Sequence, residues 1–192
     1  MIGTSKTLLI LSTFLASLLT NVSPAKAINL IQNGDFEKGF SQSEWVLLGS
    51  ATISTYNAYQ AIGGIGVSSS DPFLVSFNDG DRVPNGSISQ TISTVEGQKY
   101  VLSFLYGNYR SVGVSIGTQS IKVDISDFNG ASLVSQIIID PTGNNNFDNI
   151  LSSYSLSFIA TSNQTKIEFS DTSSDTNSTD GLLDNIDVTL VP

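Results

Sequence analysis

One stretch of the chain decides its fold: Asn29-Leu30-Ile31-Gln32-Asn33-Gly34-Asp35-Phe36-Glu37, followed a few residues later by Trp45. Its residues alternate in the manner of a β-strand that is broken by the Asn-Gly pair. In a strand, Asn33, Asp35 and Glu37 point to the same side, and they offer the hard oxygen ligands that calcium prefers. The stretch therefore predicts a strand with a candidate metal site at its end.

The residues before this stretch have the pattern of an export signal. Lys6 supplies a positive start, Leu8 to Leu19 form an apolar run, and Ala25-Lys26-Ala27 forms a small-x-small cleavage site. The apolar run is too short to span a bilayer comfortably. We expect a signal peptide at 1–27 and a secreted, extracellular domain at 28–192, with no membrane span in the mature chain.

The composition excludes several classes of function. The chain has a formal net charge of −9, and loss of the two lysines of the signal would make the mature domain more acidic. Such a surface argues against nucleic acid and against anionic membranes as partners. The chain has no Cys and no His, so disulfides, imidazole zinc sites and Ser-His-Asp or Cys-His catalysis are excluded.

The rest of the chain carries the patterns of short strands. Clear alternation or apolar runs occur at Ser87–Ile92, Tyr100–Tyr106, Ile121–Ile125, Tyr154–Ala160 and Ile167–Phe169. Leu133–Ile139 is nearly continuous apolar, which predicts a strand buried on both faces. About ten such strands, with no helical period and no internal repeat, predict one all-β domain, a two-sheet antiparallel β-sandwich.

The closing strand, predicted from Leu182 to Val191, carries an acidic residue on an apolar face. That face consists of Leu182, Asp184, Ile186, Val188 and Leu190. A carboxylate buried there must be paired, hydrogen-bonded or bound to metal. If Asp184 faced Asp35 and Glu37, three negative charges would lie close together, and a bound cation could neutralise them. The alternative is that Asp184 caps backbone amides at the start of the strand.

Three blocks of the sequence resemble carbohydrate-binding modules of the family 4, 9 and 22 type. The blocks are Asn29–Glu37 with Trp45, then Gly86–Ile92 with Glu96–Phe104, and finally Asp184–Val188. Plant cell-wall proteins of the domain-of-unknown-function 642 family share them. The ending Val188–Pro192 is similar to the point where exported bacterial relatives continue into a Pro-Glu-Pro sorting tail. Here the chain stops, so we expect a released protein.

This resemblance implies a galactose-binding-like β-sandwich, also called a jelly roll. It also implies one structural calcium ion (Ca2+) where the first and last strands meet. Carried onto this chain, Glu37 and Asp184 become the main ligands, with Asp35 and Asn185 as further ones. Asn185 stands where many relatives have Asp.

The leading functional hypothesis is a non-catalytic module that binds a cell-wall or extracellular polysaccharide or glycan. Sugar sites of this kind stack aromatic rings on sugar faces, while amides and arginines hold the hydroxyls. Tyr106, Asn108, Tyr109 and Arg110 form the best local cluster, and Tyr56, Tyr59 and Gln60 form a second. The alternative for each residue is that Tyr106 belongs to the core and the others decorate loops.

Two further hypotheses come from other classes. An envelope or matrix structural or adhesion protein, with cell-envelope proteins as partners and no sugar site, fits the acidic surface rich in Ser, Thr and Asn equally well. A glycosidase or lyase would need paired carboxylates. Besides Glu37 the glutamates are Glu44, Glu96 and Glu168, and none sits in a recognisable catalytic pair. We therefore expect a protein that is not an enzyme.

Overall fold

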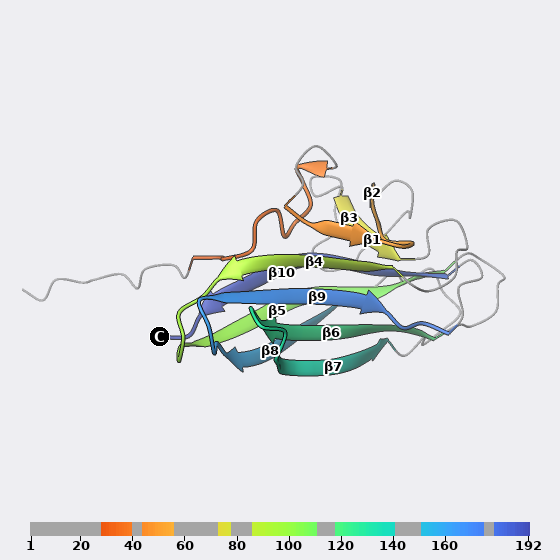
Figure 1. Ribbon diagram of the computed structural model, residues 1–192. Helices are drawn as coiled ribbons and strands as arrows, with labels where there is room; N and C mark the ends of the chain where they lie inside the picture. The colour runs from red at the N-terminus through yellow and green to blue at the C-terminus, as the bar shows by residue number, and fades with distance from the viewer. Residues whose placement is uncertain are drawn as a thin grey trace, which may run out of the picture.

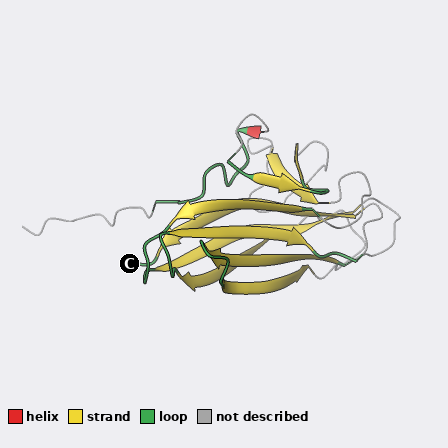
Figure 2. Cartoon of the chain, in the orientation of Figure 1, coloured by secondary structure: helices red, strands yellow, loops and turns green. Residues whose placement is uncertain are grey.

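The computed structural model describes residues 28–39, 44–55, 73–77, 86–110, 118–140, 151–174 and 179–192. In these ranges ten strands form two five-stranded sheets, in which every paired strand is antiparallel (Figure 1). Apart from one helical residue at Gly39, the described residues are strand, turn or loop (Figure 2). The predicted two-sheet β-sandwich is confirmed.

The strands follow an order that sends the chain back and forth between the sheets. The first sheet has the order β1 (Val46–Leu48), β4 (Ser87–Ser93), β9 (Gln164–Asp171), β6 (Gln119–Asp127), β7 (Ser132–Asp140). The second has the order β2 (Thr52–Thr55), β3 (Phe73–Phe77), β10 (Thr179–Leu190), β5 (Lys99–Arg110), β8 (Ser152–Ile159). The two longest strands, β5 and β10, lie side by side in the second sheet.

The core lies between the sheets and is built by alternating side chains. On β5 the inward residues are Tyr100, Leu102, Phe104 and Tyr106, all buried. They face buried residues of the first sheet: Ile121, Val123, Ile125, Ile167 and Phe169. The rings of Phe104 and Phe169 meet across the layers at 5.0 Å between centroids, at an interplanar angle of 75°. The predicted alternation of these strands is confirmed.

The prediction that Leu133–Ile139 is buried on both faces is wrong. This run forms most of β7, an edge strand whose pairing partner in the described residues is β6. Ile137 is 57% exposed and Ile139 is 59% exposed, while Ile138 between them is buried. A continuous apolar run does not by itself tell a central strand from an edge strand.

The predicted single face of the closing strand is also wrong, because β10 contains a β-bulge. Its register with β5 shifts between Asp184 and Asp187, and Asn185 has a φ of 49°. Leu183 points into the core before the bulge, whereas Ile186 and Val188 do so after it. The bulge thus reverses the alternation, and Asp184 lies on the opposite face of the sheet from Ile186.

The opening stretch is not the predicted strand. Residues 31–38 form bends and turns, with Asn33 at a φ of 52° and Phe36 at a φ of 56°. Positive φ values interrupt an extended backbone. As a result Asn33 is buried while Asp35 is exposed, and the expected shared face of Asn33, Asp35 and Glu37 does not form.

Within the described residues, no helix is long and apolar enough to cross a membrane. The described start of the chain and its C-terminus lie at the same end of the sandwich (Figure 1).

Candidate functional site

The opening segment is hydrogen-bonded along β10. β3 pairs with β10 as far as Leu183, and the opening segment contacts β10 beyond that point. The Leu30 amide donates to the Val188 carbonyl at 2.9 Å, and the Ile186 amide donates to the Gly34 carbonyl at 2.9 Å. We call residues 29–34 with Ile186 and Val188 the clasp. The sequence-based expectation that the beginning and the end of the domain meet is confirmed.

Gly34 lets the two backbones of the clasp come close together. A Cβ atom placed on Gly34 would lie 2.0 Å from the Ile186 carbonyl oxygen. No side chain fits at that distance, so the clasp requires glycine at this position.

Asn29 extends the clasp with its side chain, a role that the sequence reasoning missed. Its Oδ1 accepts from the amides of Ile31 at 2.8 Å and Val188 at 3.0 Å. Its Nδ2 donates to the Ile186 carbonyl at 3.4 Å. An Asn that bonds the amide two residues on is a common turn signal, and that signal was available in the sequence.

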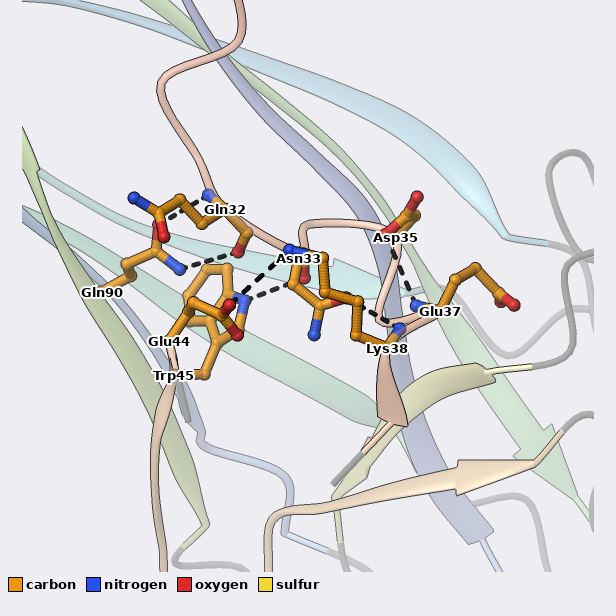
Figure 3. Close-up of polar contacts among 8 residues, drawn as sticks. All are labelled: Gln32, Asn33, Asp35, Glu37, Lys38, Glu44, Trp45 and Gln90. Carbon is orange, nitrogen blue, oxygen red and sulfur yellow. Dashed lines mark hydrogen bonds and ion pairs between the residues drawn. The ribbon is translucent and has the colours of Figure 1, made fainter. Parts of the chain in front are cut away.

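Gln90 on β4 and Trp45, the residue before β1, hold the other side of the opening segment (Figure 3). The Gln32 amide donates to Gln90 Oε1 at 2.8 Å, and Gln90 Nε2 donates to the Gln32 carbonyl at 2.9 Å. Trp45 Nε1 donates to the Asn33 carbonyl at 3.0 Å. The Trp45 ring is buried, 5.7 Å from the ring of Phe36. The segment therefore bridges the two sheets.

Asn33, considered as a calcium ligand from the sequence, has a structural contact instead. Its Oδ1 accepts from the Lys38 amide at 3.1 Å, and this bond closes the turn between them. The Lys38 ammonium lies 3.6 Å from Glu44 Oε1. These contacts hold the turn that presents Asp35 to solvent.

Glu37 and Asp184 reach the corner where β3 meets β10. Glu37 Oε1 accepts from the Phe73 amide at 2.9 Å, and Phe73 opens β3 two residues before Val75, the partner of Leu183. Asp184 follows Leu183 directly. It is fully buried, and its Oδ1 accepts from the Asn185 amide at 2.7 Å. Both carboxylates therefore accept from backbone amides. The alternative for Asp184 foresaw amide partners at the start of the strand, whereas Asp184 lies inside β10, at the bulge.

Asp35 and Asn185 line a polar cleft beside the clasp. The cleft has a volume of about 540 Å³ and is also lined by Asn29, Asn33, Ser103 and Asp187. Calcium takes six to eight oxygen ligands. Within the described ranges, no three side chains of Asp, Glu, His or Cys come together in a group that could hold a metal ion. Any calcium site here would need further oxygens from main-chain carbonyls or from other parts of the chain.

The predicted sugar-binding cluster lies where β5 ends beside the start of β10. Tyr106 is fully buried in the core, and its Oη is 3.0 Å from the position of a Cβ on Gly181. Stacking on a sugar needs an exposed ring face, which Tyr106 does not offer. This matches the core alternative stated for Tyr106.

The structure describes only some of the remaining residues of the two clusters. Asn108 is half-buried and pairs with Gly181, while Tyr109 and Arg110 pair with Asp180 and Thr179. Only the backbones of Tyr109 and Arg110 are described. Tyr56, Tyr59 and Gln60 lie outside the described residues.

The other glutamates lie in separate parts of the fold. Glu44 is ion-paired with Lys38, and Glu168 on β9 is ion-paired with Lys166. Glu96 is exposed in the turn between β4 and β5.

One carboxylate on the outer face of the first sheet has a shifted pKa. Asp124 Oδ2 lies 2.8 Å from the Lys122 ammonium. Burial raises the pKa of Asp124, but hydrogen bonds from Lys122 and Ser135 and the charges of Lys122 and Lys166 together lower it below 3.8.

Comparison with known proteins places the chain among β-sandwich modules. A family described as "Protein of unknown function (DUF642)" matches residues 29–189. No curated protein matches the chain. Among solved structures, a CBM61 module in complex with β-1,4-galactotriose superposes with a TM-score of 0.60 at 17% identity, over 86% of this chain and 100% of the module.

Two further structures share the fold. The CBM22-1 xylan-binding domain of Paenibacillus barcinonensis has a TM-score of 0.51 at 14% identity, over 86% of this chain and 96% of that domain. The cleaved adhesin domain of Lys-gingipain from Porphyromonas gingivalis has a TM-score of 0.53 at 12% identity, over 82% of this chain and 96% of that domain. At these identities the likeness concerns the fold.

Proposed function

The chain belongs to the DUF642 family, and we propose that it is a secreted, non-catalytic binding module for an extracellular or cell-wall glycan. One observation carries the proposal: its sandwich covers the full length of a carbohydrate-binding module solved with a galactose oligosaccharide. A xylan-binding domain shares the same fold over nearly its whole length. The acidic charge of the chain suits a neutral sugar better than a polyanion.

The binding residues of this proposal are those at the end of β5. Asn108, Tyr109 and Arg110 offer an amide, a phenol ring and a guanidinium, the groups that hold sugar hydroxyls and stack on sugar faces. Tyr106 lies in the core against Gly181 and supports β5 from there. Tyr56 and Tyr59 form the second candidate cluster.

A glycan array that includes galactans and xylans tests this function. We expect retention of at least one polysaccharide, and we expect Arg110→Ala to weaken it at least about tenfold, because a charge-assisted hydrogen bond of about 1.5 to 3 kcal/mol is lost. Lys99→Ala is the matched control, since Lys99 is an exposed cation at the other end of the same strand. If the folded protein retains no glycan at millimolar sensitivity, the proposal fails.

A structural calcium ion near the clasp belongs to the same proposal. Glu37 and Asp184 would hold it at the corner of β3 and β10, with Asp35 and Asn185 as further oxygen donors. The support is chemical: carboxylate and amide oxygens are the ligands that calcium prefers. The ion would offset the negative charges of Glu37 and Asp184.

Thermal unfolding with EDTA and with millimolar calcium tests this ion. A ligand that binds only the folded state should raise the free energy of unfolding by about 2 to 4 kcal/mol at saturation. Glu37→Gln should remove most of this gain, whereas Glu96→Gln, in an exposed turn, should keep it. Identical melting curves with and without calcium would exclude the site.

A second candidate function is a structural or adhesion protein of the envelope or matrix. It is favoured by the burial of Tyr106, which removes the first aromatic of the sugar cluster, and by the shared fold with an adhesin domain. The glycan array separates the two candidates. If the protein binds no glycan on the array but is retained by purified cell-envelope proteins, the adhesion function is favoured.

A further inference from the structure

The outer edge of β7 carries no charge between its β-bulge at Leu133 and its last residue, Asp140. β7 closes the first sheet, and its partner among the described strands is β6. The run from Ser132 to Ile139 contains no charged residue and no proline. Natural proteins usually protect such an edge with lysines, prolines or bulges, because its unpaired amides and carbonyls are a template for another strand.

The other three edge strands are less suited to pairing. β1 has three residues and β2 has four. β8 has eight residues, but its exposed positions are mostly serines. β7 has nine residues with Ile137 and Ile139 more than half exposed on its outer face. It is also the lowest strand of the sandwich as drawn in Figure 1.

We propose that β7 is a self-association edge at which two copies of this chain pair antiparallel about a twofold axis at Gln136. The strand pattern is complementary to itself in this register. Val134 lies opposite the partner's Ile138, Ser135 lies opposite the partner's Ile137, and Gln136 lies opposite the partner's Gln136. The exposed Ile137 of each copy thus gains a cross-strand neighbour, and the side-chain amides of the two Gln136 residues can bond to each other.

The charges beside this edge are complementary in the same register. On β6, Lys122 pairs with Ile137 and Asp124 pairs with Ser135. One row of side chains across the dimer therefore contains, in order, Asp124, Ser135, the partner's Ile137 and the partner's Lys122. Each of the two symmetry-related rows carries one positive and one negative charge, about 14 Å apart. At that distance the charges attract each other only weakly, and in this register no like charges face each other across the new strand pair.

The predicted dimer is weak. One strand pair buries less surface than the roughly 1,200 Å² at which stable interfaces begin. We therefore expect association that depends on protein concentration. If the chain is a glycan-binding module, each dimer then carries two binding sites. Two copies joined this way would bind a repeating ligand with avidity.

Sedimentation velocity on the protein exported from its full-length gene tests the proposal, between about 10 µM and about 1 mM. We expect a monomer that shifts to a dimer as concentration rises. Gln136→Glu and Gln136→Lys should each weaken association at least tenfold, because like charges then face each other at the axis. An equal mixture of the two variants should restore it, because opposite charges meet.

Ser155→Glu on the exposed edge of β8 is the matched control and should leave association unchanged. Because Gln136 and Ser155 are both exposed, we expect these variants to fold, and circular dichroism checks that they do. A monomer at every concentration would overturn the proposal. So would a dimer that neither Gln136 variant weakens, or a mixture of the variants that fails to associate.

Discussion

The side-chain amide of Gln90 exchanges two hydrogen bonds with the main chain of Gln32, at 2.8 and 2.9 Å. A side chain on β4 therefore offers the opening segment the same donor and acceptor that a neighbouring strand would offer. This pair ties the segment to the first sheet, while Leu30 and Gly34 tie it to β10 in the second. The segment joins the two layers, although it has no strand conformation of its own.

Removing the Gln90 amide should loosen this connection. Gln90→Met keeps most of the side-chain volume but loses both hydrogen bonds, and at about 1 kcal/mol each it should cost about 1 to 2 kcal/mol of stability. Urea unfolding followed by Trp45 fluorescence measures this, since Trp45 is the only tryptophan and it bonds to Asn33 in the same segment. Thr91→Ala, at the exposed neighbouring position, should cost less than about 0.5 kcal/mol. Equal effects of the two changes would contradict this account.

Gly34→Ala should be among the most damaging small substitutions in the chain. The added methyl group would lie 2.0 Å from the Ile186 carbonyl oxygen, so the clasp must open or the backbone must move. We expect a loss of about 3 kcal/mol, the upper range for overpacking, measured by urea unfolding.

Gly130→Ala is the control for the clasp. Gly130 has a φ of +82° but open space around it, so its substitution should cost only the backbone penalty of about 1 to 2 kcal/mol. A Gly34 variant that is as stable as the Gly130 variant would show that the clasp does not depend on close approach.

The sandwich could be predicted from the sequence because the inward residues of β5, β6 and β9 obey the period of two. Tyr100, Leu102, Phe104 and Tyr106 alternate in sequence and alternate in the structure. The errors lie where the backbone leaves that period. The Asn33-Gly34 pair signalled a break in the opening stretch, whereas neither the bulge at Asn185 nor the turn at Phe36 has a side-chain pattern that distinguishes it from a strand.

The candidate site was harder to predict, because it depends on these irregular positions. The sequence brought Glu37 and Asp184 to the same part of the fold, as the structure does. It could not show that Asp35 and Asn185 line the polar cleft beside the clasp. The sequence left Tyr106 with two roles, core residue and sugar ligand, and its full burial decides for the core.

The bulge in β10 should depend on the residue at position 185. Asn185 has a φ of 49°, a conformation that Asn and Gly tolerate better than other residues. Asn185→Gly should change stability by less than about 0.5 kcal/mol, whereas Asn185→Ala should cost about 1 to 2 kcal/mol. Thermal unfolding of both variants without added calcium measures the difference. If the alanine variant is as stable as the glycine variant, the strained backbone is not the reason for Asn at this position.

The ion pair of Lys122 and Asp124 should make stability depend on pH in the acid range. The pKa of Asp124 is lowered below 3.8 in the folded protein, so the unfolded chain binds a proton more readily than the folded one. The contribution of Asp124 is therefore fully present above its unfolded pKa, and it is lost as pH falls through the folded pKa. Because the pair is partly exposed, with side-chain accessibilities of 40% and 32%, its size should be at most about 1 kcal/mol.

Urea unfolding of the wild-type protein and of Asp124→Asn, from pH 7 down to pH 2.5, isolates this contribution from the other carboxylates. We expect the variant to be less stable at pH 7, with the difference shrinking below about pH 4 as Asp124 becomes protonated. Added salt should reduce the difference at pH 7, because the pair is accessible to ions. A difference that stays constant down to pH 2.5 would show that the substitution disturbs packing, and that the charge of Asp124 does not stabilise the sheet.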